Sequence, residues 1–257
     1  MNESLDDLKR LLDRCSPEEL STLFDYVKGR LPQHPQEKEW GVSADVILSA
    51  ISRSTDLTKR GVRGIIAEAI FERHTLAELT GWEALDFVGD RPYDFLIRSR
   101  TPEAKEVRIQ VKLQRMKEQR PMLASEGNRH YPNTLHVVEV QKTRGGIDAT
   151  TKKDTRPYHF GEFDILAVNM QPSTQKWERF MFTVGNWLLP RNPDAELIEK
   201  FQPVSDSANA VWTDNLETCI GWLIAGEQKR VLDIDLNLLK RRKKKRKRSK
   251  RGRKARK

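Results

Sequence analysis

Apolar residues recur at helical spacing over the first thirty positions of the chain. Leu5, Leu8 and Leu11 fall on one face of a predicted helix. Ser16 then begins the segment SPEEL, which combines an N-cap serine, a proline at the first helical position and a glutamate three residues after the cap. The pattern predicts a helical hairpin over residues 1–35. Its apolar stripe is expected either to pack on the main domain or to mediate dimerisation.

Two more helices are predicted before residue 80. Ser43 can cap the first, which should turn Val46, Ile47 and Ala50 inward. The second covers residues 58–79 and carries Glu68 at its centre. Its apolar positions keep the helical spacing, and they are Val62, Ile65, Ile66, Ala69 and Ile70.

After Gly81 the pattern changes to short apolar or alternating runs separated by turn residues. Such runs indicate strands, and they cover residues 82–88, 93–97, 107–113, 135–140, 163–168 and 179–184. Helices are predicted again at 194–201 and 216–225. The order of helices, then strands, then helices favours an α/β (α+β) domain with a mixed central sheet flanked by helices.

The run VRIQVKLQ is the most informative strand. Side chains alternate across a sheet, so Arg108, Gln110, Lys112 and Gln114 share a polar face opposite an apolar one. An ordinary strand with a solvated face would show the same alternation. The preceding run YDFLI can pair with it as a hairpin, which would bring Asp94 beside Gln110 and Lys112.

These three side chains suit metal-assisted hydrolysis. A carboxylate and an amide oxygen are hard ligands of the kind that Mg²⁺ accepts while keeping several waters. A lysine beside the metal can orient or deprotonate the attacking water. Glu68, on the helix expected to cover the sheet, can add a carboxylate through water.

On these residues the sequence resembles the PD-(D/E)xK nucleases, the restriction-endonuclease-like superfamily, over residues 61–168. The resemblance rests on Glu68 in RGIIAEAIFE, Asp94 in RPYDFLI, and Gln110 and Lys112 in IQVK. Glutamine replaces the usual acidic residue two positions before the lysine, as in a variant branch of the superfamily. That branch also tends to show a later tyrosine before an apolar, acidic strand, which RPYHFGEFDILAV with Tyr158 and Asp164 resembles.

The resemblance implies a role for each site residue. Asp94 would bind Mg²⁺ directly, with Mn²⁺ as a substitute, and Gln110 would offer its carbonyl. Lys112 would assist the nucleophile, and Glu68 would act as an outer metal ligand. Tyr93 separates Pro92 from Asp94, so the PD dipeptide is not literal. Because glutamine makes the site one carboxylate poorer, metal affinity should be lower than in a glutamate version.

Charge is divided unequally along the chain. Residues 240–257 contain 15 Lys and Arg and no acid, whereas residues 1–239 contain 32 basic and 37 acidic residues, a net charge of −5. Self-repulsion and the lack of apolar residues predict a disordered tail. The tail serves solubility or sorting, or it binds nucleic acid, which dense Lys and Arg favour through counterion release. The tail residues expected to contact nucleic acid include Lys240, Arg241, Arg242, Lys243, Lys244, Lys245 and Arg246.

The segment VEVQKTR also combines an acidic and a basic residue, but it is not expected to form a catalytic site. Glu139 and Lys142 are three residues apart, which places them on opposite faces of a strand. The segment is interpreted as a core strand followed by a basic turn, in which Lys142 and Arg144 contact phosphate. The predicted domains are therefore the hairpin 1–35, a nuclease domain 36–239 and the tail 240–257.

The remaining composition narrows the class of protein. Two distant cysteines and five scattered histidines show neither disulfide nor zinc-site spacing. The absence of a long apolar run predicts no membrane association and an intracellular, cytoplasmic location, with the nucleoid as the site in a prokaryote.

Three functions are compatible with these patterns. The first is a Mg²⁺-dependent DNA endonuclease like a type II restriction enzyme, for which a homodimer and a cognate methyltransferase are the expected partners. The second is a nuclease of the same fold that recognises the shape of repair or recombination intermediates. The third is a non-catalytic nucleic-acid-binding protein that uses the basic tail.

Overall fold

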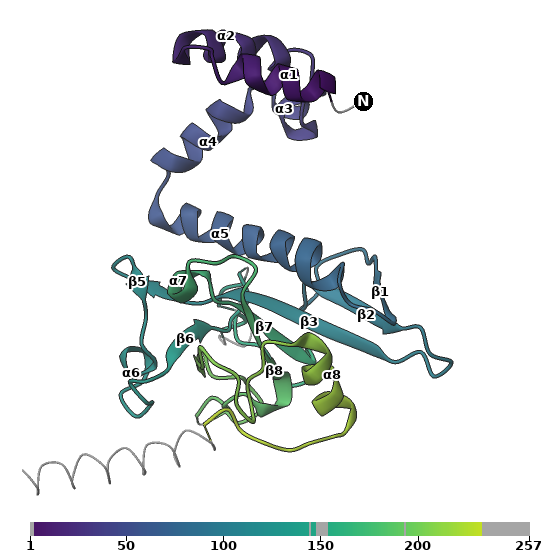
Figure 1. Cartoon of the computed structure of the whole chain (residues 1–257). Helices are drawn as coiled ribbons and strands as arrows, with labels where there is room; N and C mark the ends of the chain where they lie inside the picture. The colour runs from purple at the N-terminus through teal and green to yellow at the C-terminus, as the bar shows by residue number, and fades with distance from the viewer. Residues whose placement is uncertain (1–2, 144, 148–153, 193, 233–257) are drawn as a thin grey trace, which may run out of the picture. The chain divides into compact units, whose positions relative to one another are not determined.

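The computed structural model of the 257-residue chain describes residues 3–143, 145–147, 154–192 and 194–232. The chain forms two compact units, Met1–Lys59 and Arg60–Lys257 (Figure 1). The predicted tail, residues 240–257, and Arg144 lie outside the described residues. No helix in the described ranges is both long enough and apolar enough to cross a membrane.

The described residues of the first unit form four complete helices. They are α1 (Glu3–Leu12), α2 (Pro17–Lys28), α3 (Pro35–Trp40) and α4 (Ala44–Arg53). The two predicted N-terminal helices are confirmed, and so is the capping box, in which Ser16 Oγ accepts from Glu19 N at 3.3 Å and a Glu19 carboxylate oxygen accepts from Ser16 N at 2.8 Å. The unit also includes α3 and α4, which the sequence pattern assigned to the 36–239 domain.

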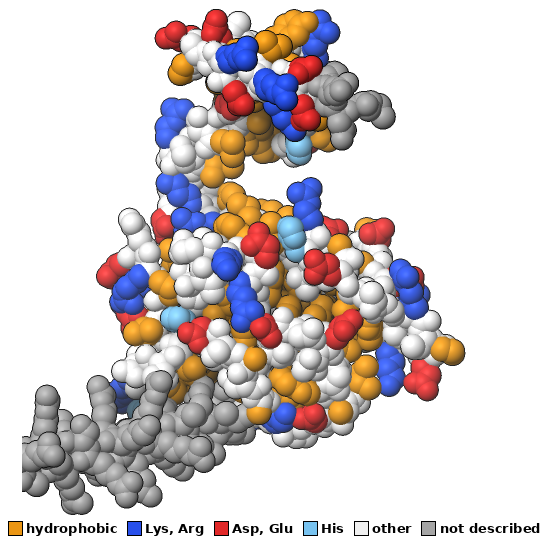
Figure 2. Space-filling model, viewed as in Figure 1, with side chains coloured by type: hydrophobic (Ala, Val, Ile, Leu, Met, Phe, Trp, Pro, Cys, Tyr) orange, Lys and Arg blue, Asp and Glu red, His pale blue; other side chains and the backbone are white. Residues whose placement is uncertain are grey.

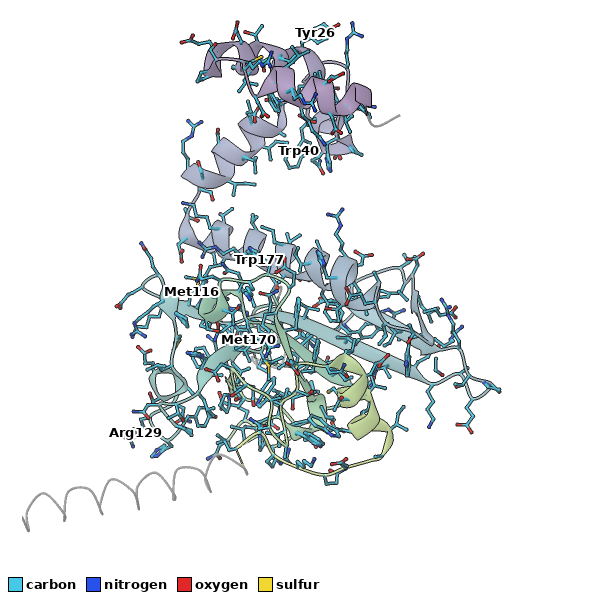
Figure 3. All side chains as sticks on the ribbon, in the orientation of Figure 1. Tyr26, Trp40, Met116, Arg129, Met170 and Trp177 are labelled. Carbon is cyan, nitrogen blue, oxygen red and sulfur yellow. The ribbon has the colours of Figure 1, made fainter. Side chains whose placement is uncertain are left out.

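The expected cap and inward face of α4 are corrected. Ser43 is the N-cap residue but makes no side-chain capping bond. Instead, the Glu37 carboxylate accepts from the backbone N–H of Ala44 at 2.6 Å. Val46 is 54% exposed, because this unit has little interior. Tyr26 and Trp40, labelled in Figure 3, are likewise on the surface.

The second unit is built on a mixed five-stranded sheet in the order β1-β2-β3-β7-β8. Its β3 and β7 are parallel and the other neighbours are antiparallel. The five strands are β1 (Trp82–Leu85), β2 (Phe95–Ser99), β3 (Glu106–Leu113), β7 (Ile165–Asn169) and β8 (Phe180–Val184). These strands confirm five of the predicted runs, and the mixed α/β class is confirmed with them.

Every residue of β7 and β8 is buried, so the sheet carries the core of this unit. Met170, labelled in Figure 3, follows β7 and is fully buried. Acidic and basic side chains are interspersed over the visible face of the unit (Figure 2). Charges of both signs are therefore mixed on this face of the unit, around an apolar sheet.

The predicted long helix is α5 (Asp56–Ile70), which continues into a π-helical segment, Phe71–Leu76. Its buried face differs from the prediction, because Ala67 and Phe71 are fully buried while Ile65 is 65% exposed. The Phe71 ring lies 5.2 Å from the ring of Phe95 and 5.4 Å from that of Phe180, measured between centroids. These contacts fix the helix on one face of the sheet.

Smaller elements complete the second unit. Strand β6 (His136–Glu139), which confirms the sixth predicted run, pairs with β9 (Phe201–Val204). A hairpin, β4 (Met116–Lys117) with β5 (Arg120–Pro121), contacts the middle of α5, where an Arg63 guanidinium nitrogen is 3.5 Å from the sulfur of Met116, labelled in Figure 3. Two short helices, α6 (Ala124–Gly127) and α7 (Gln171–Thr174), follow β5 and β7.

The predicted helix at 194–201 is wrong. Leu197 and Ile198 form isolated β-bridges with His159 and Pro190, and Phe201 begins β9. The neighbouring extended segments satisfy the backbone groups of this stretch, so a long-range pairing overrides local helical spacing. The last predicted helix is confirmed as α8 (Leu216–Ile224), which packs on β7 and β8 and begins where the Asn215 side chain accepts from Thr218 N at 2.7 Å.

Candidate active site

Asp94 lies at the point where β2 leaves β3. Its backbone N–H donates to the carbonyl of Ile109 at 3.0 Å, the last main-chain bond between the two strands in this direction. Beyond it, the Asp94 carboxylate replaces the missing strand and accepts from the backbone N–H of Val111 at 2.8 Å. The carboxylate is therefore held at a fixed position on the edge of an opening in the sheet.

Gln110 is bound to Asp94 on one side and to Tyr158 on the other. Its side-chain amide nitrogen donates to the same Asp94 oxygen, and its amide oxygen accepts from the Tyr158 hydroxyl at 3.1 Å. Gln110 is 1% exposed, as is Gln114. The alternative of an ordinary solvated polar face on β3 is therefore wrong at these two positions, because α5 and the loop before β7 cover the strand.

Lys112 follows on the same side of β3. Burial lowers the pKa of its ammonium group, and the negative charges of Asp94 and Glu68 act in the opposite direction. Its Nζ lies 5.7 Å from the centroid of the Tyr158 ring. Burial of Lys112 thus favours a neutral amine more than water does, while the two nearby carboxylates favour the ammonium form.

Glu68 comes from α5 and faces the same opening. Burial and the charge of Asp94 together raise the pKa of Glu68 to about 7, against the opposing effect of Lys112. Burial also raises the pKa of Asp94, against stabilisation by Lys112, Val111 N–H and Gln110. Two carboxylates that repel each other without full compensation form a site that a divalent cation would stabilise.

The opening is a cleft of about 280 Å³. All four predicted catalytic residues, Glu68, Asp94, Gln110 and Lys112, line it. The structure therefore brings together residues from α5, the start of β2 and the middle of β3. The cleft is completed by Asp90, Arg91, Pro92, Lys142, Thr143, Tyr158 and Glu162.

The donor set fits a hard divalent cation. No group of three or more His, Cys, Asp and Glu side chains suited to a metal occurs in the described ranges. The available oxygens are instead those of Asp94, the Gln110 amide, the backbone carbonyl of Val111, which lies 3.2 Å from the Gln110 amide nitrogen, and Glu68 farther out. Few protein oxygens and several waters are the usual ligands of Mg²⁺.

Tyr158 allows Gln110 to serve as a ligand. With the present amide orientation, the nitrogen of Gln110 faces Asp94 and its oxygen faces Tyr158. A half-turn of the amide would direct the oxygen toward a cation, and the Tyr158 hydroxyl would then accept from the amide nitrogen, since a hydroxyl both donates and accepts. Both orientations therefore leave the buried tyrosine hydrogen-bonded.

The other predicted site residues fall in different places. Lys142 lines the cleft, whereas Glu139 lies outside it and forms an ion pair with Lys200 at 3.3 Å. Glu139 and Lys142 therefore do not form a site together, as the sequence pattern predicted. Asp164, noted in the resemblance, lies outside the cleft and forms two hydrogen bonds to the Arg108 guanidinium at 2.9 and 2.7 Å. Nothing is described for Arg144 or for residues 240–246.

Sequence reasoning named Tyr158 and Lys142 separately but missed that they form a second wall of the cleft with Glu162. Glu162 forms an ion pair with Lys142 at 2.7 Å, and Tyr158 contributes its hydroxyl and ring. Asp90 and Arg91 precede Asp94 and were given no role. Spacing gives no signal for Glu162, because it reaches the cleft from a loop more than fifty residues after Asp94.

Removal of the Glu68 charge should stabilise the protein at alkaline pH. The folded-state pKa of about 7 exceeds the reference value of 4.5, so the favourable contribution of protonated Glu68 is complete below 4.5 and is lost as the pH rises through 7. Glu68→Gln should therefore melt a few degrees above the wild type at pH 8 and close to it at pH 4.5.

Melting curves of the two proteins between pH 4.5 and 8 test this expectation. Glu72→Gln, an exposed change in the following π-helical segment, is the control and should show no such trend. Added Mg²⁺ should reduce the difference in melting temperature between Glu68→Gln and the wild type at pH 8, because the cation would compensate the charge of Glu68. If the melting temperatures of Glu68→Gln and the wild type depend on pH in the same way, folding does not raise the pKa of Glu68.

Comparisons with protein-family models, with curated proteins and with solved structures gave no match to this chain.

Proposed function

We propose that this protein is a metal-dependent endonuclease that hydrolyses phosphodiester bonds of DNA, with a restriction-endonuclease-like core. The observation that carries the proposal is the convergence of Asp94, Gln110 and Lys112 with Glu68 on one cleft, at the place where β2 leaves β3. The resemblance of the site residues to the PD-(D/E)xK pattern also favours this chemistry, but the arrangement of those residues in the cleft is the main support.

Each site residue would have a separate role in hydrolysis. A bound Mg²⁺ would polarise the phosphoryl oxygen and lower the pKa of a water. Asp94 and the Gln110 amide oxygen would hold the cation on the rigid edge of β3. Lys112 would orient the attacking water and take its proton, which its lowered pKa favours. Glu68 would hold a second water and exchange a proton near neutral pH.

A binding-only role explains the site less well. A protein that binds nucleic acid through its tail has no need for two carboxylates under mutual repulsion beside a buried lysine. Among nucleases, a restriction-like enzyme and a structure-specific repair enzyme remain distinct proposals. A homodimer, a cognate methyltransferase and a cytoplasmic or nucleoid location belong to the first of them.

Incubation with supercoiled plasmid, in Mg²⁺ and in EDTA, tests the proposal. Discrete fragments that form in Mg²⁺ and not in EDTA would support a sequence-specific endonuclease. Cleavage restricted to branched substrates would support the repair alternative. No cleavage of plasmid or branched DNA, with Mg²⁺ or with Mn²⁺, would reject the nuclease function and leave nucleic-acid binding.

Truncation after residue 239 should weaken DNA binding and reduce its dependence on salt. The removed segment holds 15 Lys and Arg and no acid. For every phosphate that the tail neutralises, its removal should lower the slope of log affinity against log salt by ~0.9. Cleavage at low salt should persist, because the cleft is built from residues 68–162.

Binding titrations of both proteins at several salt concentrations would measure the two slopes. Replacement of the tail by Gly and Ser at equal length is the matched control for chain length. If the slope is the same with and without the tail, the tail does not bind DNA phosphates.

A further inference from the structure

A second lysine, Lys142, lines the cleft together with Lys112. Lys142 Nζ lies 5.5 Å from the centroid of the Tyr158 ring, and Lys112 Nζ lies 5.7 Å from the same centroid. Lys142 forms an ion pair with Glu162 at 2.7 Å. Two ammonium groups therefore approach one aromatic ring, and one of the two is already neutralised by a carboxylate.

The two members of this ion pair are held differently. One Glu162 oxygen accepts from Lys142 and the other accepts from the backbone N–H of His159 at 2.8 Å, so the carboxylate is fixed by its own loop. Lys142 is fixed at its backbone, where its N–H donates to the Arg156 carbonyl at 2.8 Å. Its ammonium has three donors, and Glu162 takes one. The lysine head can thus exchange its partner while its stem stays in place.

The charge of the cleft favours such an exchange when an anion enters. Its lining has four carboxylates, on Glu68, Asp90, Asp94 and Glu162, against three cations, on Arg91, Lys112 and Lys142. Before a divalent cation binds, a phosphodiester therefore meets a net negative lining, whether or not Lys142 is paired with Glu162. When Lys142 moves from Glu162 to the phosphate, its positive charge lies beside the anion and reduces the repulsion there.

We infer that Lys142 is a phosphate-binding residue of the cleft that moves from Glu162 to a DNA phosphodiester, and that Glu162 competes with DNA for it. This inference rests on the proposed function, since it names a substrate-positioning residue and its competitor within the same site. Lys142 would contribute to DNA binding, whereas Lys112 would activate the attacking water.

Paired variants give opposite expectations. Lys142→Gln should raise KM for a short duplex roughly tenfold, the low end for a hydrogen bond to a charged group. Glu162→Gln should lower KM about two- to fivefold, the range that a partly exposed ion pair supplies. The glutamine oxygen can still accept from His159 N–H, so this variant loses the charge and keeps the loop. In both variants kcat should stay within about twofold of the wild type, since neither touches the reacting atoms.

A matched pair outside the cleft controls for general charge effects. Lys200 pairs with Glu139 at 3.3 Å and lies 5.1 Å from the Phe201 ring, so it has an ion pair and a ring contact like those of Lys142 outside the cleft, although Glu139 also pairs with Arg115 at 3.3 Å. Lys200→Gln and Glu139→Gln should leave KM unchanged. Melting curves of all four variants exclude loss of folding as the cause of any change.

DNA-binding titrations in EDTA separate this inference from the nuclease proposal. Lys142→Gln should reduce the slope of log affinity against log salt by ~0.9, the value for a single neutralised phosphate. Wild type that binds DNA but never cleaves it would reject the nuclease function, while these titrations still decide the role of Lys142. The inference is overturned if the slope is unchanged, if both variants shift affinity in the same direction, or if kcat falls with KM unaltered.

Discussion

Asp94→Asn and Lys112→Met should each reduce DNA cleavage by several orders of magnitude while the protein remains folded and bound to DNA. Asparagine removes the charge that would hold Mg²⁺, and methionine removes the amine that would activate water. General-base assistance alone contributes ~10²–10⁴-fold to a rate. Single-turnover cleavage of a labelled duplex in Mg²⁺ measures the loss directly.

The choice of substitutions follows from the contacts of the two residues. Asp94 accepts from Val111 N–H at 2.8 Å and from the Gln110 amide, so alanine would leave buried donors without partners. Asparagine keeps an acceptor for Val111. Methionine keeps the apolar stem of Lys112 beside Tyr158. Any loss of cleavage by these variants can then be assigned to lost chemistry.

Two further measurements make the test decisive. Lys105→Met, a change of an exposed lysine in the loop between β2 and β3, should retain full cleavage. Thermal melts and DNA titrations should show that all three variants fold and bind. Wild-type cleavage rates for either site variant, with folding intact, would remove this cleft from the mechanism.

Phe71→Ala should destabilise the second unit by about 3–5 kcal/mol, the range for loss of a buried aromatic ring. Phe71 is fully buried, and its ring lies within 6.3 Å of the rings of Phe95, Phe180 and Phe182, measured between centroids. The close packing of these rings leaves a cavity when one of them is removed. Urea unfolding, followed by the fluorescence of the buried Trp187 and Trp212, reports on this unit.

The helix itself provides the control for this substitution. Ile65→Ala lies two turns earlier on α5, at a position that is 65% exposed, and should change the free energy of unfolding by less than about 1 kcal/mol. Equal losses for the two variants would mean that α5 is not anchored through Phe71. A large loss for Phe71→Ala alone would confirm the anchor that also positions Glu68.

Local patterns determined the elements of the sheet and the identity of the site residues. Period-two alternation in 107–113 and the apolar runs around it predicted the strands, because a strand with one packed face needs that alternation wherever it lies. The pairing of neighbouring strands through a short loop was sufficient to bring Asp94 to Gln110. The segregation of basic residues into 240–257 can also be read from the sequence alone.

The tertiary structure decided what surrounds those residues. Gln110 is buried because Tyr158, 48 residues later, covers it and binds its amide. Glu68 has a pKa of about 7 because α5 places it against Asp94 in a poorly hydrated cleft. The same long-range packing placed Leu197 and Ile198 in bridges and Phe201 in a strand, within the predicted helix 194–201.

Spacing along the chain therefore fixed which groups stand on one strand or one helix face. It did not fix burial, hydrogen-bond partners or the charge around a group, because these depend on segments that meet only after folding. Lys142 shows the difference most clearly. The sequence identified it as a basic residue in a turn, and only the fold placed it in the cleft with Glu162 as its partner.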